Sequence, residues 1–147
     1  MSLSQVGCFL SHYALWRRLA TFDGTKQYII LEDDMEFAPD FTLADLSSAL
    51  PKEYDMVYLW KHPATLDHYE AHHVPGQAYA TFYPQWGTTA YMITPKIARL
   101  LLKQIKTLYA PIDDMLIKDI MGSLKTFIMK KDYFTTGTFP SMIFGEV

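Results

Sequence analysis

The chain has 147 residues, half of them hydrophobic, and a formal net charge of -3. This predicts one globular domain with a core, and it excludes both a disordered chain and a protein that binds nucleic acid through its phosphates. A single cysteine excludes an internal disulfide and a thiolate zinc cage, and no stretch is long enough to span a bilayer, so we expect a cytoplasmic protein.

An amphipathic helix is predicted at the start of the chain. Ser2 and Gln5 have the spacing of a capping box, and Asp23-Gly24 ends the helix. Apolar residues recur between them at intervals of three and four: Val6, Phe9, Leu10, Tyr13, Trp16 and Ala20. Gly7 costs about 1 kcal/mol relative to Ala, which indicates close packing against a neighbour or a ligand at that point.

Three further residues of this helix have side chains that could take part in binding or catalysis. Cys8 lies in the apolar pattern, and we interpret it as a small core residue. Ser11 and His12 leave two interpretations open: both lie at the rim of a functional site, or they are a helix-surface Ser and a partly buried His.

The next element is the strand predicted for residues 28–31, which ends in three consecutive carboxylates, Glu32, Asp33 and Asp34. In open α/β sheets ligands bind at the carboxyl ends of the strands. Adjacent carboxylates repel one another unless a cation or a sugar hydroxyl offsets the repulsion. The segment therefore predicts a functional site, with a solvated strand-to-loop junction as the alternative.

A loop is predicted for residues 35–39, followed by a short helix that Asp40 caps and Pro51 ends. Residues 55–60 predict a second buried strand. If it runs parallel to the first, its end at Lys61-His62-Pro63 lies near the carboxylates.

Residues 63–76 predict an irregular, solvated loop. The spacing of His68 and His72 would suit a metal ion only on a helix, and Pro63, Pro75 and Gly76 argue against one. We therefore favour a loop without a metal site.

Residues 79–82 and 88–93 predict two strands that pair with each other in antiparallel orientation. Thr94 and Pro95 then open a helix whose outer face carries a basic stripe: Lys96, Arg99, Lys103 and Lys106. The stripe is either a solvated face or a surface for anionic lipid head groups.

A short helix is predicted from Pro111 towards Gly122, with Asp113 and Asp114 in its first turn. This second carboxylate pair could supply a general base. Residues 125–129 predict the last strand.

Four segments resemble glycosyltransferase family 25, which includes bacterial lipooligosaccharide galactosyltransferases and collagen galactosyltransferases. They are VGCFLSHYALW at residues 6–16, ILEDD at 30–34, GTTAYMITP at 87–95 and PID at 111–113. The resemblance implies a GT-A-like α/β fold, with a mixed sheet flanked by helices. It also implies one partial glycosyltransferase domain over residues 1–147.

The resemblance implies transfer of a hexose, galactose from UDP-galactose, to a lipooligosaccharide or another surface glycan, with Mn²⁺ or Mg²⁺ as cofactor. It implies that Asp34 and Glu32 hold the cation and that Asp113, or else Asp114, is the catalytic base. The remaining implied donor-binding residues are Asp33, Ser11, His12, Thr88 and Thr89, together with Glu32. A hard cation on carboxylate oxygens would stabilise the charge of the leaving diphosphate.

The chain departs from the family in one respect, because the usual first nucleotide-binding strand-helix unit does not precede residue 6. We expect the sheet edge left open to pair with a second copy, giving a homodimer, and we expect peripheral contact with the inner membrane.

Two alternatives to the glycosyltransferase function stay open. One is a non-catalytic remnant or interaction module, which donor titration would reveal. The other is a metal-dependent phosphohydrolase, against which Met35 and Glu36 offer no nucleophile.

Overall fold

The computed structural model describes residues 1–84 and 86–137, with residues 65, 67 and 68 described by their backbone alone. Its main sheet has five strands in the order β1-β5-β3-β6-β4. Their bounds are Tyr28–Leu31 for β1, Met56–Tyr58 for β3, Tyr79–Thr81 for β4, Ala90–Ile93 for β5 and Thr126–Met129 for β6. Strands β3 and β6 are parallel, and the other pairs are antiparallel.

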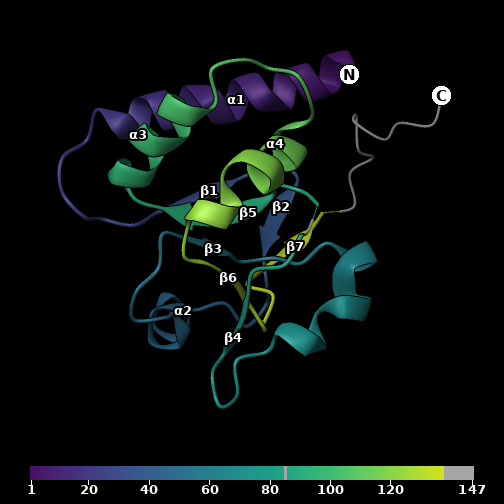
Figure 1. Cartoon of the computed structure of the whole chain (residues 1–147). Helices are drawn as coiled ribbons and strands as arrows, with labels where there is room; N and C mark the ends of the chain where they lie inside the picture. The colour runs from purple at the N-terminus through teal and green to yellow at the C-terminus, as the bar shows by residue number, and fades with distance from the viewer. Residues whose placement is uncertain (85, 138–147) are drawn as a thin grey trace.

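Four α-helices flank the sheet. Their bounds are Leu3–Ala20 for α1, Leu43–Ala49 for α2, Pro95–Gln104 for α3 and Ile112–Asp119 for α4. Figure 1 shows α1, α3 and α4 gathered on one side of the sheet and α2 away from them. The predicted α/β class with a mixed sheet is thus confirmed. Of the helices that the structure describes, none is long and apolar enough to cross a membrane.

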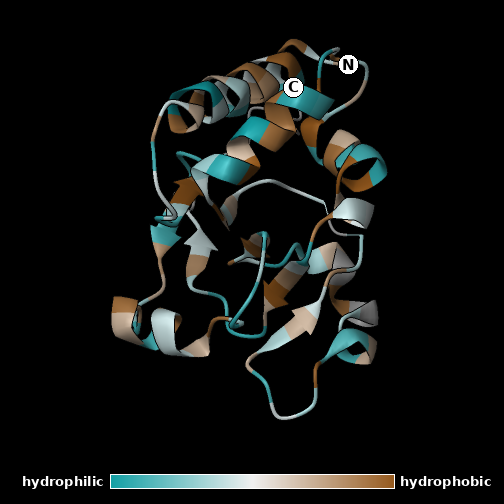
Figure 2. Cartoon of the chain, turned by 60° about the vertical axis from the view of Figure 1, so that its left-hand side comes forward, coloured by the Kyte–Doolittle hydropathy of each residue, from teal (hydrophilic) through white to brown (hydrophobic). Residues whose placement is uncertain are grey.

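The sheet is buried on both faces. In β3, Met56 and Tyr58 belong to the core that includes α1, α3 and α4, whereas Val57 belongs to a second core with Leu46 of α2. Side chains alternate between the two faces of a strand, so a strand covered on both faces has an unbroken apolar sequence. The coloured ribbon shows hydrophobic and hydrophilic segments alternating along the helices, as expected where one side of a helix is packed (Figure 2).

The predicted starts of α1 and α3 are confirmed. The hydroxyl of Ser2 accepts a hydrogen bond from the backbone N–H of Gln5 at 3.2 Å, and the Gln5 side chain accepts from the N–H of Ser2 at 2.8 Å. Thr94 caps α3, and Pro95 is its first residue. Arg99 of the predicted basic stripe donates hydrogen bonds to the carbonyl oxygens of Ala20 and Phe22, and so ties α3 to the end of α1.

The loop predicted for residues 35–39 is wrong in its first half. Met35–Phe37 forms β2, which pairs with β7 (Phe134–Thr136) in a second, two-stranded sheet. Strand β7 also means that residues 125–129 do not form the last strand. The partner of β2 lies almost at the other end of the sequence, so local pattern could not reveal the pairing.

The predicted cap of the next helix is also wrong. Helix α2 starts at Leu43, and the hydroxyl of Thr42 accepts the capping hydrogen bond from the N–H of Asp45. Asp40 instead forms an ion pair with Lys131 at 2.9 Å. Both Asp and Thr are favoured N-cap residues, so residue type alone does not distinguish Asp40 from Thr42.

The strands predicted at 79–82 and 88–93 exist as β4 and β5, but they do not pair with each other. Strand β4 pairs with β6 at one edge of the sheet, while β5 lies between β1 and β3. The four residues of β5 are all buried, and a central position gives such a strand neighbours on both sides.

Three smaller predictions also fail. Residues 63–76 are not wholly irregular, because Pro63–His68 and Glu70–His72 form short 3-10 helices and Tyr69 between them is buried. Nothing lies within 4 Å of a Cβ built at Gly7, so this glycine is not needed for close packing against a neighbour. Leu10 of the predicted apolar stripe is 57% exposed.

Lys61 holds the carboxyl end of β3 in place. Its buried ammonium donates to the carbonyl oxygens of Met129 and Lys130 and forms an ion pair with Asp132 at 2.6 Å. We predict that Lys61→Ala lowers the free energy of unfolding by about 2–3 kcal/mol, because buried acceptors lose their donor.

Urea denaturation measures this change. Lys52→Ala, at an exposed lysine, is the matched control and should stay within about 0.5 kcal/mol of the parent. Equal effects of the two substitutions would contradict the role given to Lys61.

Candidate functional site

One pocket of about 740 Å³ opens at an edge of the main sheet. Strand β5 is antiparallel to both β1 and β3, so the carboxyl ends of those two strands meet the beginning of β5. The first turn of α4 and one side of α1 complete the wall. The lining residues are Gln5, Cys8, Glu32, Asp34, Trp60, His62, Pro63, Trp86, Gly87, Thr88, Thr89, Pro111, Ile112, Asp113, Asp114 and Thr136. The predicted approach of the two strand ends is thus confirmed.

Four carboxylates line this pocket, two from each of two elements. Glu32 and Asp34 follow β1, and Asp113 and Asp114 lie in the first turn of α4. None of the described lining residues is a lysine or an arginine. The pocket therefore attracts cations, and it repels an anion that enters without one.

Six of the nine predicted site residues line the pocket: Glu32, Asp34, Thr88, Thr89, Asp113 and Asp114. The other three do not. Asp33 is exposed beside the pocket, and the exposed hydroxyl of Ser11 donates to the carbonyl oxygen of Gly7 at 3.0 Å. His12 is buried behind Glu32 and is 3% exposed.

Asp34 has an unsatisfied oxygen. Its Oδ1 atom is buried and has no hydrogen-bond partner among the described residues, while its backbone carbonyl accepts from the N–H of Gly137 at 2.7 Å. Burial, the charge of Glu32 and that of Asp33 raise the pKa of the Asp34 carboxyl above its usual value. A buried carboxylate oxygen without a donor is costly, and a bound cation would offset that cost.

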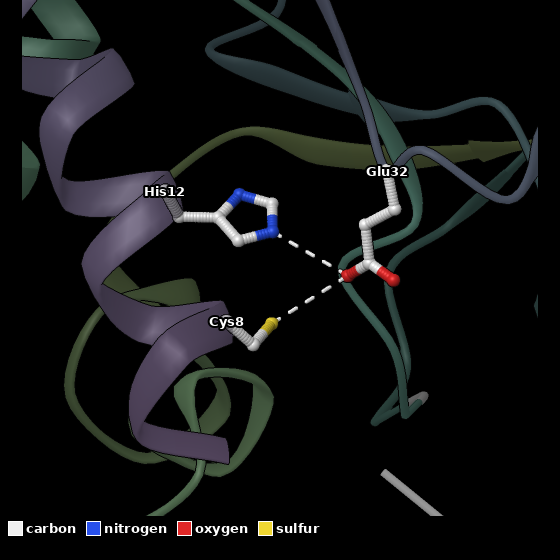
Figure 3. Close-up of side chains that lie close together, drawn as sticks. All are labelled: Cys8, His12 and Glu32. Carbon is white, nitrogen blue, oxygen red and sulfur yellow. Dashed lines mark hydrogen bonds and ion pairs between the residues drawn. The ribbon is translucent and has the colours of Figure 1, made fainter. Parts of the chain in front are cut away.

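Glu32, in contrast to Asp34, receives several hydrogen bonds on its carboxylate. Its Oε1 atom accepts hydrogen bonds from Nε2 of His12 at 3.4 Å, from the Thr88 hydroxyl at 3.1 Å and from the Cys8 thiol at 3.7 Å. Figure 3 shows the Cys8 and His12 side chains reaching from one face of α1 to this carboxylate. Burial opposes ionisation of Glu32, but the hydrogen bonds outweigh it and lower its pKa.

A buried relay orients His12. The indole N–H of Trp16 donates to the Tyr91 hydroxyl at 2.9 Å, and that hydroxyl lies 2.8 Å from Nδ1 of His12. Since an indole can only donate, the Tyr91 oxygen accepts from Trp16 and its own proton faces Nδ1. A neutral His12 then has its proton on Nε2, where it points to Glu32. The relay fixes the carboxylate from behind the pocket.

In the described part of the chain, one group of side chains could hold a metal ion, because the donor atoms of Cys8, His12 and Glu32 lie within 4.8 Å of one another. The hydrogen bonds to Glu32 account for this arrangement better than a metal ion does. Burial and the charge of Glu32 raise the pKa of the Cys8 thiol to about 12, so in the free protein the thiol keeps its proton and can donate it to Glu32. A metal on Nε2 would also move the proton to Nδ1 and leave the buried Tyr91 hydroxyl without an acceptor. Cys8 packs against the main core, which agrees with its interpretation as a core residue, but it is only half-buried and also lines the pocket.

Asp113 is anchored by the backbone. Its Oδ2 atom accepts from the N–H of Gly87 at 3.0 Å, and its Oδ1 atom accepts from the N–H of Asp114 at 3.1 Å. A carboxylate oxygen has two lone pairs, so each oxygen can still accept one more proton donor from the pocket. The orientation of a group that could receive a proton is therefore set before any ligand binds.

Residues 1–116 match the family described as Glycosyltransferase family 25 (LPS biosynthesis protein). The chain belongs to glycosyltransferase family 25. All four segments that carry the family resemblance contribute to the pocket, namely through Cys8, through Glu32 and Asp34, through Gly87 to Thr89, and through Pro111 to Asp113. The family pattern thus coincides with the wall of one site.

The names of similar proteins differ, because some include the word "inactive" and others do not. A "Glycosyltransferase 25 family member" of Anopheles gambiae is 30% identical over 125 residues, which cover 79% of this chain and 20% of the relative. A "Probable inactive glycosyltransferase 25 family member 3" of Bos taurus is 30% identical over 122 residues, and an "Inactive glycosyltransferase 25 family member 3" of Homo sapiens is 30% identical over 123. Each match covers 79% of this chain and 20% of that relative. The chain thus spans about a fifth of the length of these relatives.

The sequence pattern placed His62 near the carboxylates but did not predict its two indole neighbours in this family 25 pocket. Trp60, His62 and Trp86 line it, with ring centroids 5.8 Å apart for Trp60 and His62 and 6.1 Å apart for His62 and Trp86. The signal was available in Trp86, which directly precedes the Gly87-Thr88-Thr89 segment. Tyr91 was missed as well, because its partners Trp16 and His12 lie more than 70 residues away.

The relay makes a testable prediction. Tyr91→Phe leaves the indole of Trp16 and Nδ1 of His12 without a partner, and should lower the free energy of unfolding by about 1–3 kcal/mol. Tyr13→Phe, at a half-buried tyrosine of α1, is the control and should change it by less than about 0.5 kcal/mol.

Nitrogen-15 NMR of the imidazole tests the direction of the relay. The parent protein should have the His12 proton on Nε2, and Tyr91→Phe should weaken that preference. A parent imidazole with its proton on Nδ1 would contradict the assignment.

Proposed function

We propose that this chain is a GT-A-like glycosyltransferase domain that transfers a hexose from a nucleotide-sugar donor to a glycan. The donor we propose is UDP-galactose, and the acceptor is a lipooligosaccharide or another surface glycan. The observation that carries the proposal is the pocket with four carboxylates and no lysine or arginine among its described lining residues. A nucleoside diphosphate is strongly anionic, so such a pocket would hold it only together with a divalent cation.

The donor atoms at the end of β1 fit Mn²⁺ or Mg²⁺. Both ions prefer carboxylate oxygens, and Asp34 offers a buried oxygen that no described residue satisfies. We propose that Asp34 holds the cation with Glu32. When bound, the cation would neutralise the charge that develops on the departing UDP.

The protein residues would do the rest of the chemistry. Asp113 is our first choice for the base, and Asp114 is the second. Asp113 would accept the proton of the acceptor hydroxyl while the hydroxyl oxygen forms a bond to the anomeric carbon of the donor sugar. The bond from that carbon to UDP would break at the same time, with inversion at the carbon. The hydrogen bond from the Gly87 N–H would hold the Asp113 carboxylate in a fixed orientation.

The predicted donor-binding residues divide by their contacts. Thr88 and His12 would act through Glu32, since both already bind its Oε1 atom. Glu32 and Thr89 would contact the donor directly from the pocket wall. Asp33 and Ser11 lie outside the lining, and no contact seen here supports their predicted role.

A non-catalytic module is the second candidate function. The names of the bovine and human relatives call those proteins inactive, although they match the same 79% of this chain. In that case the pocket would keep its shape but would fail to bind the donor.

Two associations are also proposed. Strand β1 pairs only with β5 in the described sheet, and its other edge could pair with a second copy to form a homodimer. Lys96 and Lys103 are exposed on α3, and Lys106 is exposed just after its end; together they could attract anionic head groups at the inner membrane, which would make the protein peripheral there.

Calorimetric titration tests the proposed function. UDP-galactose should bind when Mn²⁺ is present and not without it, and Asp34→Asn should weaken the cation-dependent binding at least about tenfold. Asp34→Asn should be as stable as the parent or more stable, because it removes repulsion from Glu32 and Asp33.

Asp23→Asn, at an exposed aspartate outside the pocket, is the matched control and should bind like the parent. No binding to the folded parent with Mn²⁺ would favour the non-catalytic module. Unchanged binding by Asp34→Asn would remove Asp34 from the cation site.

A further inference from the structure

Trp86 differs from the other two tryptophans of the chain. Trp16 is fully buried and Trp60 is 9% exposed, whereas Trp86 is 53% exposed although it lines the pocket. Exposing an indole to water gives up the favourable burial of a large apolar surface. An exposed aromatic face inside a pocket that also holds a few polar groups is typical of a surface that a ligand covers.

The backbone beside Trp86 is tied to Asp113. Gly87 has φ of +88°, a conformation that favours glycine, and its N–H donates to Oδ2 of Asp113 at 3.0 Å. A Cβ at Gly87 would lie 3.5 Å from Cζ3 of Trp60, so this turn packs on a buried ring. His62 meets Trp86 edge-on, with ring centroids 6.1 Å apart. Trp86 thus directly precedes, in the chain, the residue whose N–H holds the Asp113 carboxylate, and both Trp86 and Asp113 line the pocket.

We propose that the face of Trp86 is a stacking platform for the pyranose ring of the acceptor. The face of an indole is negative, and the C–H groups on one side of a pyranose are weakly positive, so a neutral sugar ring stacks there. The inference rests on the proposed function, since it takes the acceptor hydroxyl to be the group that Asp113 deprotonates.

The nucleobase of the donor is the other ring that could stack on an indole. Its position is less suitable, because the ribose and the diphosphate separate the base from the reacting carbon. The acceptor ring, in contrast, carries the hydroxyl that must touch Asp113. Trp86 adjoins the residue that holds Asp113, so it lies where the acceptor ring must lie.

NMR of the indole N–H signals tests the platform, because the chain has only three tryptophans. The probes are methyl β-D-galactopyranoside, methyl β-D-glucopyranoside and UMP, each added to the full chain with Mn²⁺. We expect at least one glycoside to shift the Trp86 signal and to leave the Trp16 signal in place. A Trp86 signal that moves with UMP alone, or with no probe, would overturn the proposal.

Two substitutions separate stacking from simple apolar contact. Trp86→Phe keeps an aromatic face and should raise the dissociation constant of the bound glycoside by no more than about threefold. Trp86→Leu keeps apolar area without the face and should raise it by about tenfold or more. Equal effects of the two substitutions would contradict stacking.

Binding of UDP with Mn²⁺ is measured on the same samples and keeps the two hypotheses apart. If UDP binds but no glycoside shifts Trp86, the platform is wrong and the proposed function stands. If UDP fails to bind, the proposed function is wrong. The shifts caused by the glycosides then still show whether a sugar ring stacks on Trp86.

Discussion

The site depends on the position of β5 between β1 and β3. Because β5 is antiparallel to both neighbours, the ends of β1 and β3 and the beginning of β5 lie at one edge of the sheet. Glu32, Trp60 and Thr88 come from three separate parts of the chain and meet there. With β5 elsewhere in the sheet, the carboxylates after β1 would not face the aromatic residues after β3.

The carboxylates of the pocket are prepared for different tasks. Glu32 receives three hydrogen bonds and is oriented by a relay that ends at the buried indole of Trp16. Asp34 has a raised pKa and a buried oxygen to which none of residues 1–84 and 86–137 donates a hydrogen bond. The buried Asp34 oxygen without a hydrogen bond, next to the Glu32 carboxylate, lowers the stability of the free protein. A bound cation would restore that stability, so the arrangement favours cation binding. This is how binding sites commonly depart from the rules that govern the core.

Local sequence predicted the elements better than their partners. The strand at Tyr28–Leu31, the capped helix at Pro95 and the acidic first turn of α4 were all visible in short patterns. The pairing of β2 with β7 and of β4 with β6 was not, since each joins distant segments that have no mutual signal in a single sequence. For the same reason the place of Cys8 in the pocket wall and the role of Tyr91 were overlooked, because both depend on contacts with Glu32 and His12 across the fold. The candidate carboxylates were found because each follows a strand or opens a helix.

The central claim is that the carboxylate pocket binds a divalent cation together with a nucleoside diphosphate. Paramagnetic broadening by Mn²⁺ tests it most directly, because the effect falls steeply with distance from the ion. When Mn²⁺ and UDP are added together, the backbone amide signals of Gly87, Thr88 and Asp114 should disappear, while that of Leu101 in α3 should persist. Retention of the pocket signals, or equal broadening throughout the chain, would contradict this account.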